Sequence, residues 1–441
     1  MTKILATIGP ISSDKNLKYF LDRSEIVRLN MSHNSIEWHN RIINKIKKID
    51  PKKYILVDIP GAKPRTLNIN PVNIKKGQKI IFGFNLKKGN IIPISNPLPK
   101  LSNNKIKYFS VSDGNYLFKF VSLKNKKLTG ICLQNFVLLP KKGLNIPYSI
   151  YDENFQSKIY KKFIKKISRL KFDCIGLSFV QNSKIIRTLK KLNKSKIFIS
   201  KIENYLGYQN RKEIIEESHA TMIDRGDLAA EIGYEKLTEF TSNIINDCQK
   251  VGKPVIIATE NLNSLILNLT PSKSDIMNLD YFISRKVDYI MLSDETATSI
   301  NWKNTLNWLK GYIDLKIIKN SKSKLIDISQ IIRVLNDHVL IIFSKKGFFY
   351  HNYSSDNFSN LYLFTENKNL SKVANLKSNV KSFFTKFPKK NLDKFLFKNI
   401  KKNIKTIFKN TDNALLINVS FPRKNSRANT IVFVNKKDFL L

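Results

Sequence analysis

Short apolar runs recur from residue 4 to residue 292, and amphipathic stretches long enough for a helix separate most of them. Eight runs predict strands: Ile4–Ile8, Ile26–Leu29, Tyr54–Val57, Cys174–Leu177, Lys196–Ile199, Thr221–Ile223, Pro254–Ala258 and Tyr289–Leu292. Three intervening stretches predict helices: Phe155–Leu170, Lys184–Leu192 and Glu235–Val251. Strands that alternate with helices indicate a parallel sheet. Eight of them fit a closed (β/α)8 TIM barrel, whose active site lies at the carboxyl ends of the strands.

Two segments depart from this alternation. Residues 67–145 are rich in Gly, Pro and Asn and contain the β-like runs Lys79–Phe84 and Leu133–Leu138, which predict a small inserted β domain able to cover the barrel mouth. Beyond residue 320, strand-like runs resume at Val339–Phe343, Leu361–Phe364 and Thr430–Val434. We therefore expect a barrel from residues 1–66 and 146–318, an inserted β lid domain at 67–145 and a C-terminal α/β domain at 319–441.

The composition suits a multidomain globular protein, with 441 residues of which 42% are hydrophobic. No apolar run reaches the roughly 20 residues that span a bilayer. A strand-like run follows the first residues directly, so we expect neither a secretory signal nor a membrane anchor. The three cysteines, Cys132, Cys174 and Cys248, lack metal-ligand spacing and predict reduced thiols in a cytoplasmic protein.

The formal net charge of +43 raises the question of a nucleic-acid partner. The lysines are spread along the whole chain, and Asn and Ile are abundant as well. Drift of surface positions, as an AT-rich genome imposes, explains that distribution. No nucleic-acid recognition motif accompanies the charge, so we expect weak, salt-sensitive binding to polyanions and no specific nucleic-acid partner.

Polar side chains follow nearly every predicted strand. They are Arg28, Asn30, Ser32 and His33; Asp58, Lys63 and Arg65; Ser178; Lys201 and Glu203; Asp227; Thr259 and Glu260; Ser293 and Glu295. A single polar strand end does not indicate a functional site, because every strand must end at some polar residue. Since the carboxyl ends of barrel strands meet at one face, the full series predicts a site there.

Lys201 and Glu203 lie two residues apart at a strand end and therefore point the same way. Taken alone, they would be a surface ion pair of little consequence. Asp227, which opens a helix after the apolar run Ala220–Ile223, changes that interpretation. Glu203 and Asp227 then predict a pair of divalent-metal ligands beside an ammonium group that can clamp phosphate.

Several motifs, in this order along the chain, carry a family resemblance. They are Thr2-Lys3-Ile4 with Thr7-Ile8-Gly9-Pro10, Arg28-Leu29-Asn30-Met31-Ser32-His33, Lys201-Ile202-Glu203-Asn204, Asp224-Arg225-Gly226-Asp227-Leu228, Gly252-Lys253-Pro254-Val255-Ile256-Ile257-Ala258-Thr259 and Met291-Leu292-Ser293-Asp294-Glu295-Thr296-Ala297. Together they resemble the pyruvate kinase family over roughly the first 310 residues. The C-terminal segment resembles the family only in position and in Ala428-Asn429-Thr430-Ile431-Val432.

The resemblance implies phosphoryl transfer from phosphoenolpyruvate to ADP, giving pyruvate and ATP in glycolysis. It makes Glu203 and Asp227 ligands of Mg²⁺ or Mn²⁺, hard cations that carboxylates suit. Lys201 would neutralise the transferring phosphoryl group. Gly226 and Asp227 would receive the substrate carboxylate at a helix start. Thr259 would lie beside the methylene carbon that is protonated.

On the phosphate and nucleotide side, Arg28 and Arg65 would contact phosphate, which the guanidinium group suits. Asn30 and His33 resemble nucleotide contacts, and Lys142 resembles a lid residue that reaches the nucleotide. The family is usually tetrameric, so the resemblance also implies a homotetramer.

One motif departs from the family in a way that bears on potassium. The chain has Asp58-Ile59-Pro60-Gly61-Ala62-Lys63-Pro64-Arg65-Thr66 where many members have Asp-Thr-Lys-Gly-Pro-Glu-Ile-Arg-Thr. Lys63 in the glutamate position and Ile59 in the threonine position resemble members that work without potassium. We therefore expect the monovalent-cation site at Asn30, Ser32 and Asp58 to be replaced by the Lys63 ammonium. Drift in a decaying gene is the alternative explanation, although a charge reversal near phosphates is not neutral.

Pro60, Gln181, Glu260 and Asp294 also depart from the family, and the last two add negative charge that is expected to lower the rate. A folded but inactive relic, a polyanion-binding protein and a lyase on a similar barrel remain alternatives. The set Arg28, Lys201, Glu203, Asp227 and Thr259 favours an enzyme, and the inserted segment with His33 favours a nucleotide partner. Ser344 and Lys346 lie where family members often bind a sugar phosphate. The sequence there predicts a solvated basic turn instead.

Overall fold

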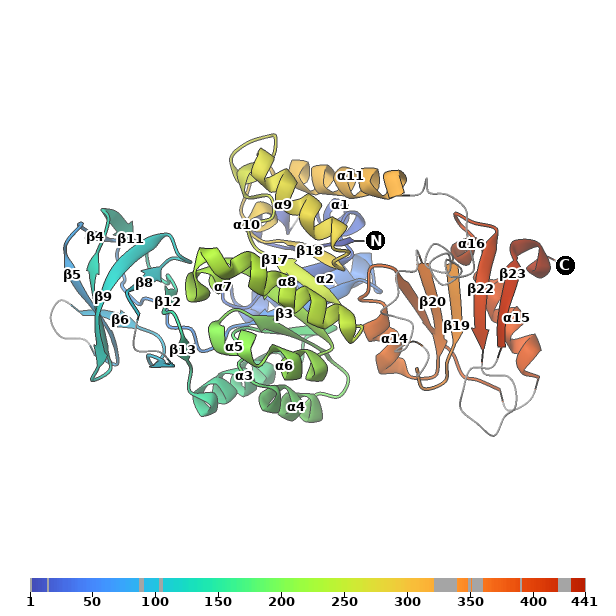
Figure 1. The fold of residues 1–441 in the computed structure, drawn as a ribbon, viewed down its shortest axis with the longest axis horizontal. Helices are drawn as coiled ribbons and strands as arrows, with labels where there is room; N and C mark the ends of the chain where they lie inside the picture. Colours follow the sequence, from blue (N-terminus) through green and yellow to red (C-terminus); the bar gives the residue numbers. More distant parts are fainter. Residues whose placement is uncertain are drawn as a thin grey trace.

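The computed structural model describes residues 2–13, 16–86, 91–102, 106–320, 339–347, 350, 360–388, 391–418 and 430–440. Figure 1 shows three parts side by side: a group of β sheets, a central barrel and a C-terminal α/β layer.

The central part is the expected (β/α)8 barrel. Its strands are β1 (Lys3–Thr7), β2 (Ile26–Asn30), β3 (Tyr54–Ile59), β14 (Cys174–Leu177), β15 (Ile197–Ile202), β16 (Ala220–Asp224), β17 (Val255–Ala258) and β18 (Tyr289–Leu292). They pair in parallel and close in the order β1-β18-β17-β16-β15-β14-β3-β2. Almost every strand residue is buried, because helices cover the outer face and side chains fill the interior. The predicted barrel is confirmed.

Helices surround the barrel, and side chains begin several of them. The helices are α1 (Leu17–Asp22), α2 (Ile36–Ile49), α3 (Glu153–Ile167), α4 (Ser183–Leu192), α5 (Tyr205–Gln209), α6 (Arg211–Glu217), α7 (Arg225–Ile232), α8 (Tyr234–Lys250), α9 (Lys273–Ser284), α10 (Asp294–Ala297) and α11 (Trp302–Asn320). Ser35, Asp152 and Asn182 accept backbone N–H groups at the starts of α2, α3 and α4. Helix α7 begins directly after β16, which fixes the position of Asp227 at the barrel mouth.

The segment between β3 and α3 forms β sheets. Its strands are β4 (Val72–Ile74), β5 (Lys79–Phe84), β6 (Ile91–Ile94), β7 (Lys100–Leu101), β8 (Tyr108–Val111), β9 (Tyr116–Lys124), β10 (Lys127–Cys132), β11 (Phe136–Leu138), β12 (Leu144–Asn145) and β13 (Ser149–Ile150). Six of them form one sheet, in the order β12-β8-β9-β10-β5-β6, over a core that includes Phe82, Phe109 and Phe118. The run predicted from Leu133 becomes a strand only at Phe136, and the side chain of Asn135, just before it, accepts the Lys76 backbone N–H at 2.8 Å.

The C-terminal layer packs against the end of the barrel opposite the mouth. Its strands are β19 (Val339–Phe343), β20 (Asn360–Thr365), β21 (Val380–Phe384), β22 (Asn413–Asn418) and β23 (Thr430–Asn435), with helices α14 (Lys368–Ala374), α15 (Leu392–Lys402) and α16 (Ile404–Ile407). Leu376 joins the core cluster inside the barrel. Lys3 Nζ, at the start of β1, donates to the Lys377 carbonyl at 3.0 Å. Ala428 and Asn429, part of the C-terminal resemblance, lie outside the described residues.

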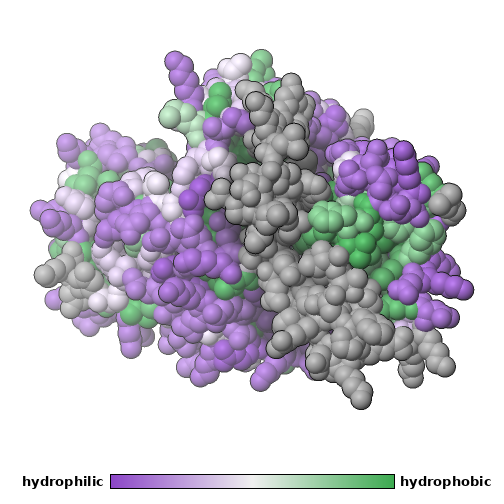
Figure 2. All heavy atoms as spheres, turned by 45° about the vertical axis from the view of Figure 1, so that its right-hand side comes forward, coloured by the Kyte–Doolittle hydropathy of each residue, from purple (hydrophilic) through white to green (hydrophobic). Residues whose placement is uncertain are grey.

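On the face that Figure 2 shows, hydrophilic residues are spread over the inserted sheets and the barrel rather than gathered in one patch. Among the described residues, no helix is both long and apolar enough to cross a membrane. The domain boundaries proposed from the sequence stay predictions.

Candidate active site

The carboxyl ends of the barrel strands bring together the side chains that the sequence singled out. Lys201 and Glu203 come from the end of β15, and Asp227 comes from the first turn of α7. Arg28 and Asp58 come from β2 and β3. These ends face the inserted sheets, which Figure 1 places beside α7.

Lys201 lies at the centre of a buried ionic cluster. Its Nζ is 2.7 Å from Glu203 Oε1, 3.2 Å from Asp224 Oδ2 and 3.4 Å from Asp58 Oδ2. Burial alone would lower the pKa of Lys201, but Asp58, Glu203 and Asp224 outweigh burial and raise it. The cluster therefore keeps a charged ammonium at a buried position near the barrel mouth, where it can interact with a phosphate group.

Arg28 is the second cation of the cluster. Its Nε and NH2 groups both lie 2.8 Å from Asp58 Oδ2, and its NH1 donates to Thr7 Oγ1 at 3.0 Å. Burial would raise the pKa of Asp58, but Lys201 and Arg28 outweigh burial and lower it. In this arrangement Asp58 orients both cations.

The carboxylates at the mouth fit a divalent cation. One oxygen each of Glu203, Asp224 and Asp227 lie within 4.8 Å of one another. Burial raises the pKa of Glu203 and of Asp227, because no full complement of positive charge compensates for it. A hard cation bound by the Glu203 and Asp227 oxygens would supply that charge, so these donors suit Mg²⁺ or Mn²⁺.

Asp224 is a site residue that sequence reasoning quoted within a motif without giving it a role. It is the last residue of β16 and its side chain is almost fully buried, at 9% exposure. The signal was present, because Asp224 follows the apolar run Ala220–Ile223 in the same way that Asp58 follows its strand.

Lys63 lies in a different place from the one inferred from the sequence. Its Nζ pairs with Asp113 at 2.7 Å and with Asp227, whereas Asp58 pairs with Arg28 and Lys201. The ammonium is therefore beside a candidate metal ligand and not in the expected ion position at Asn30, Ser32 and Asp58.

The inserted segment explains this placement of Lys63. Asn96 Nδ2 donates to the Lys63 carbonyl at 3.0 Å, and Gly143 is in such close contact with the Lys63 stem that a Cβ there would lie 2.4 Å from Cε. Burial would lower the pKa of Lys63, but Asp113 and Asp227 outweigh burial and raise it. Lys63 thus carries a permanent charge between the inserted sheets and the barrel.

The remaining substrate-side candidates meet at the start of α7. The Gly226 N–H donates to Thr259 Oγ1 at 3.0 Å, so these two residues are in contact. The first N–H groups of α7 point out of a helix of eight residues, which suits an anion such as a carboxylate.

The nucleotide-side candidates divide between two places. Arg65 and Lys142 lie on the two adjacent chain segments that join the inserted sheets to the barrel, where Arg65 pairs with Gly143 in a β-bridge and donates to the Lys141 carbonyl. Asn30 Oδ1 accepts the Ser32 N–H at 3.0 Å in the turn that carries His33. Partial burial and then the charge of Arg65 lower the pKa of His33.

The family departures fall into two kinds. Glu260 and Asp294 are exposed. Gln181 is buried and accepts the Tyr151 backbone N–H at 2.9 Å, a structural role outside the cluster.

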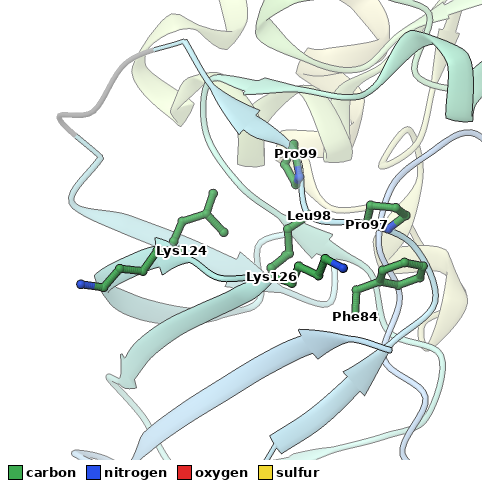
Figure 3. Close-up of a pocket in the computed structure, with 7 residues that line it drawn as sticks. Phe84, Pro97, Leu98, Pro99, Lys124 and Lys126 are labelled. Carbon is green, nitrogen blue, oxygen red and sulfur yellow. The ribbon is translucent and has the colours of Figure 1, made fainter. Parts of the chain in front are cut away.

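A separate cavity of about 310 Å³ lies in the inserted sheets, lined by Phe84, Pro97, Leu98, Pro99, Leu123, Lys124 and Lys126 (Figure 3). None of these residues belongs to the candidate site.

The fold and the cluster define an eight-stranded parallel barrel with a cation-and-carboxylate centre at its mouth. A family model described as "Pyruvate kinase, barrel domain" matches residues 1–303. A pyruvate kinase of Borreliella burgdorferi is 30% identical over 313 residues, which cover 67% of this chain and 64% of the relative. One from Thermococcus litoralis is 30% identical over 311 residues, covering 67% and 65%.

Among solved structures, a pyruvate kinase from Cryptosporidium parvum shares the fold, with a TM-score of 0.77 at 22% identity, over 98% of this chain and 96% of that chain. Since the family model matches most of the chain and the relatives reach 30% identity, the chain belongs to the pyruvate kinase family. The matches span less than two thirds of the length of these two curated relatives.

Proposed function

We propose that this protein transfers the phosphoryl group of phosphoenolpyruvate to ADP, giving ATP and pyruvate, as the glycolytic step does. The observation that supports this most is the Lys201 ammonium held among Asp58, Glu203 and Asp224 at the mouth of the barrel. A positive charge fixed there would stabilise the negative charge that develops on the phosphoryl group in the transition state.

A divalent cation would be held by Glu203 and Asp227. When bound, Mg²⁺ or Mn²⁺ supplies Lewis-acid stabilisation of the substrate oxygens. The buried position of Glu203, whose Oε2 accepts the Phe179 N–H at 2.5 Å, would keep the ligand oriented.

The chain's own residues bind and orient the substrates. Arg28 and Lys201 hold the phosphate, and the first turn of α7, at Gly226 and Asp227, receives the substrate carboxylate. The P–O bond to the enol oxygen breaks as an ADP β-phosphate oxygen bonds to phosphorus. The enolate then takes a proton from the Thr259 side at its methylene carbon, which completes pyruvate. Asn30, His33, Arg65 and Lys142 face the nucleotide.

The direct test is a coupled assay of pyruvate formation. We expect activity that requires phosphoenolpyruvate, ADP and Mg²⁺ or Mn²⁺ together, because the carboxylates of the cluster outnumber its cations and a divalent cation supplies positive charge. Omission of ADP separates this activity from that of a lyase or a phosphatase. Pyruvate formation at an equal rate without ADP would contradict the proposal.

We also propose that potassium is not required. Lys63 places a fixed ammonium beside Asp227, which needs no ion-binding equilibrium. Activity is therefore expected to be nearly equal in sodium, tetramethylammonium and potassium buffers of matched ionic strength; matching matters because the charge of +43 makes anion binding sensitive to screening.

Lys63→Glu is the matched variant for the potassium proposal. It should depress activity by placing a third carboxylate beside Asp113 and Asp227. Activation of the unmodified protein many-fold by potassium over the other two cations would contradict the proposal.

Membership of the family also supports a homotetramer in the cytoplasm. Both remain proposals that rest on the family alone.

A further inference from the structure

Thr259 has a strained backbone that its surroundings hold in place. Its φ is +62°, and the next residue, Glu260, has φ of +52°. A β-branched residue in this left-handed region is an outlier that persists only when neighbouring groups over-determine it. The buried Arg225 does so, because its NH2 donates to the carbonyls of Thr259 and Glu260 at 2.6 and 2.8 Å.

The hydroxyl of Thr259 is also held. It accepts the Gly226 N–H at 3.0 Å and lies 3.1 Å from Asp224 Oδ1. The Ala258 carbonyl, at 2.7 Å, is a second acceptor for the one hydroxyl proton. The hydroxyl proton therefore has two acceptors within reach, the Ala258 carbonyl and Asp224 Oδ1.

Asp224 connects the two ends of the proposed reaction. Its Oδ1 faces the Thr259 hydroxyl, while its Oδ2 lies 3.2 Å from Lys201 Nζ. Asp224 is itself buried and is held from both sides, so the position of its carboxylate is constrained.

We propose that Asp224 is a positioning residue that orients the Thr259 hydroxyl for protonation of the enolate. This inference rests on the proposed function and adds a residue to it. Asp224 forms no bond to substrate in this role; it keeps the hydroxyl proton away from the Ala258 carbonyl and turned toward the site.

The test measures protonation separately from phosphoryl transfer. Exchange of the methyl protons of pyruvate for solvent deuterium, followed by NMR in the presence of Mg²⁺ and ATP, reports the protonation step in reverse. We expect Asp224→Ala to slow this exchange by about tenfold or more, with a much smaller change in the KM for phosphoenolpyruvate. Asp224→Asn keeps an oxygen acceptor and should lose less than Asp224→Ala.

A double-mutant cycle then tests whether Asp224 acts through Thr259. Thr259→Val removes the hydroxyl at nearly constant volume. If Asp224 acts only by orienting that hydroxyl, the double variant Asp224→Ala/Thr259→Val should exchange at the rate of Thr259→Val alone. Additive losses would overturn the inference.

Metal binding separates this role from that of a third metal ligand. Mn²⁺ affinity, measured by electron paramagnetic resonance, should fall much less in Asp224→Ala than in Asp227→Asn, because only Asp227 is placed as a ligand. A loss in both Asp224 variants as large as that in Asp227→Asn would overturn the inference and assign Asp224 to the metal. An unmodified protein that forms no pyruvate overturns the proposed function and this inference together, whereas an active protein with additive losses overturns only this one.

Discussion

Replacement of Lys201 by alanine is expected to lower kcat by about a thousandfold while changing the KM for phosphoenolpyruvate far less. Lys201 Nζ is the ammonium that Asp58, Glu203 and Asp224 surround at 2.7 to 3.4 Å. Those carboxylates already neutralise it in the resting site, so its contribution to ground-state binding is small. Its charge counts most when negative charge shifts between the enol oxygen and the transferring group, and that loss appears in kcat.

Steady-state kinetics of Lys201→Ala and Lys201→Met check this expectation. Methionine keeps an unbranched stem in the buried space, so a similar loss in both variants assigns the effect to the charge. Removal of the ammonium also leaves buried carboxylates without a partner, which destabilises proteins by about 3–5 kcal/mol. Thermal unfolding by circular dichroism must therefore accompany the kinetics. A raised KM with unchanged kcat would show that Lys201 serves only ground-state binding.

The barrel could be predicted because its strands are buried on both faces and read as continuous apolar runs. The sequence-based predictions were wrong or incomplete where a charged functional side chain belongs to a strand. The run predicted to end at Ile199 continues as β15 to Ile202, because Lys201 points into the site and finds buried partners instead of ending the strand. Asp224 was left without a role although it opens the quoted motif, because its place as the last, buried residue of β16 was not recognised.

The position of Lys63 could not be predicted from spacing. Its partners Asp113 and Asp227 are 50 and 164 residues away in the sequence. Asp113 lies in the turn between β8 and β9, and only the packing of the inserted sheets brings it to the barrel. The departure from the family motif therefore identified Lys63 as an important residue. Its long-range contacts, which the sequence does not reveal, determine which carboxylates it pairs with.

Asp227→Asn is expected to lower activity by about a hundredfold or more and to weaken Mn²⁺ binding. Asp227 accepts hydrogen bonds from Lys63 and from Asn145 Nδ2, the latter at 2.9 Å. Asparagine has nearly the same shape, so the variant removes charge from the metal site with little change in packing. Lys63 retains Asp113 as a partner. The measurements are steady-state kinetics across a range of Mg²⁺ concentrations and Mn²⁺ binding by electron paramagnetic resonance.

Glu231→Gln supplies the matched control on the same helix. Glu231 lies one turn further along α7, where it accepts hydrogen bonds from Ser149 Oγ at 2.8 Å and the Ile146 N–H at 3.3 Å. Burial raises the pKa of Glu231 to about 8, so its carboxyl is largely neutral near pH 7 and glutamine imitates it. The control should leave Mn²⁺ affinity unchanged, because Glu231 is outside the group of carboxylates that fits a cation. Equal losses of affinity in both variants would point to a disturbed helix α7, and undiminished activity in Asp227→Asn would contradict the assignment of Asp227 to the metal.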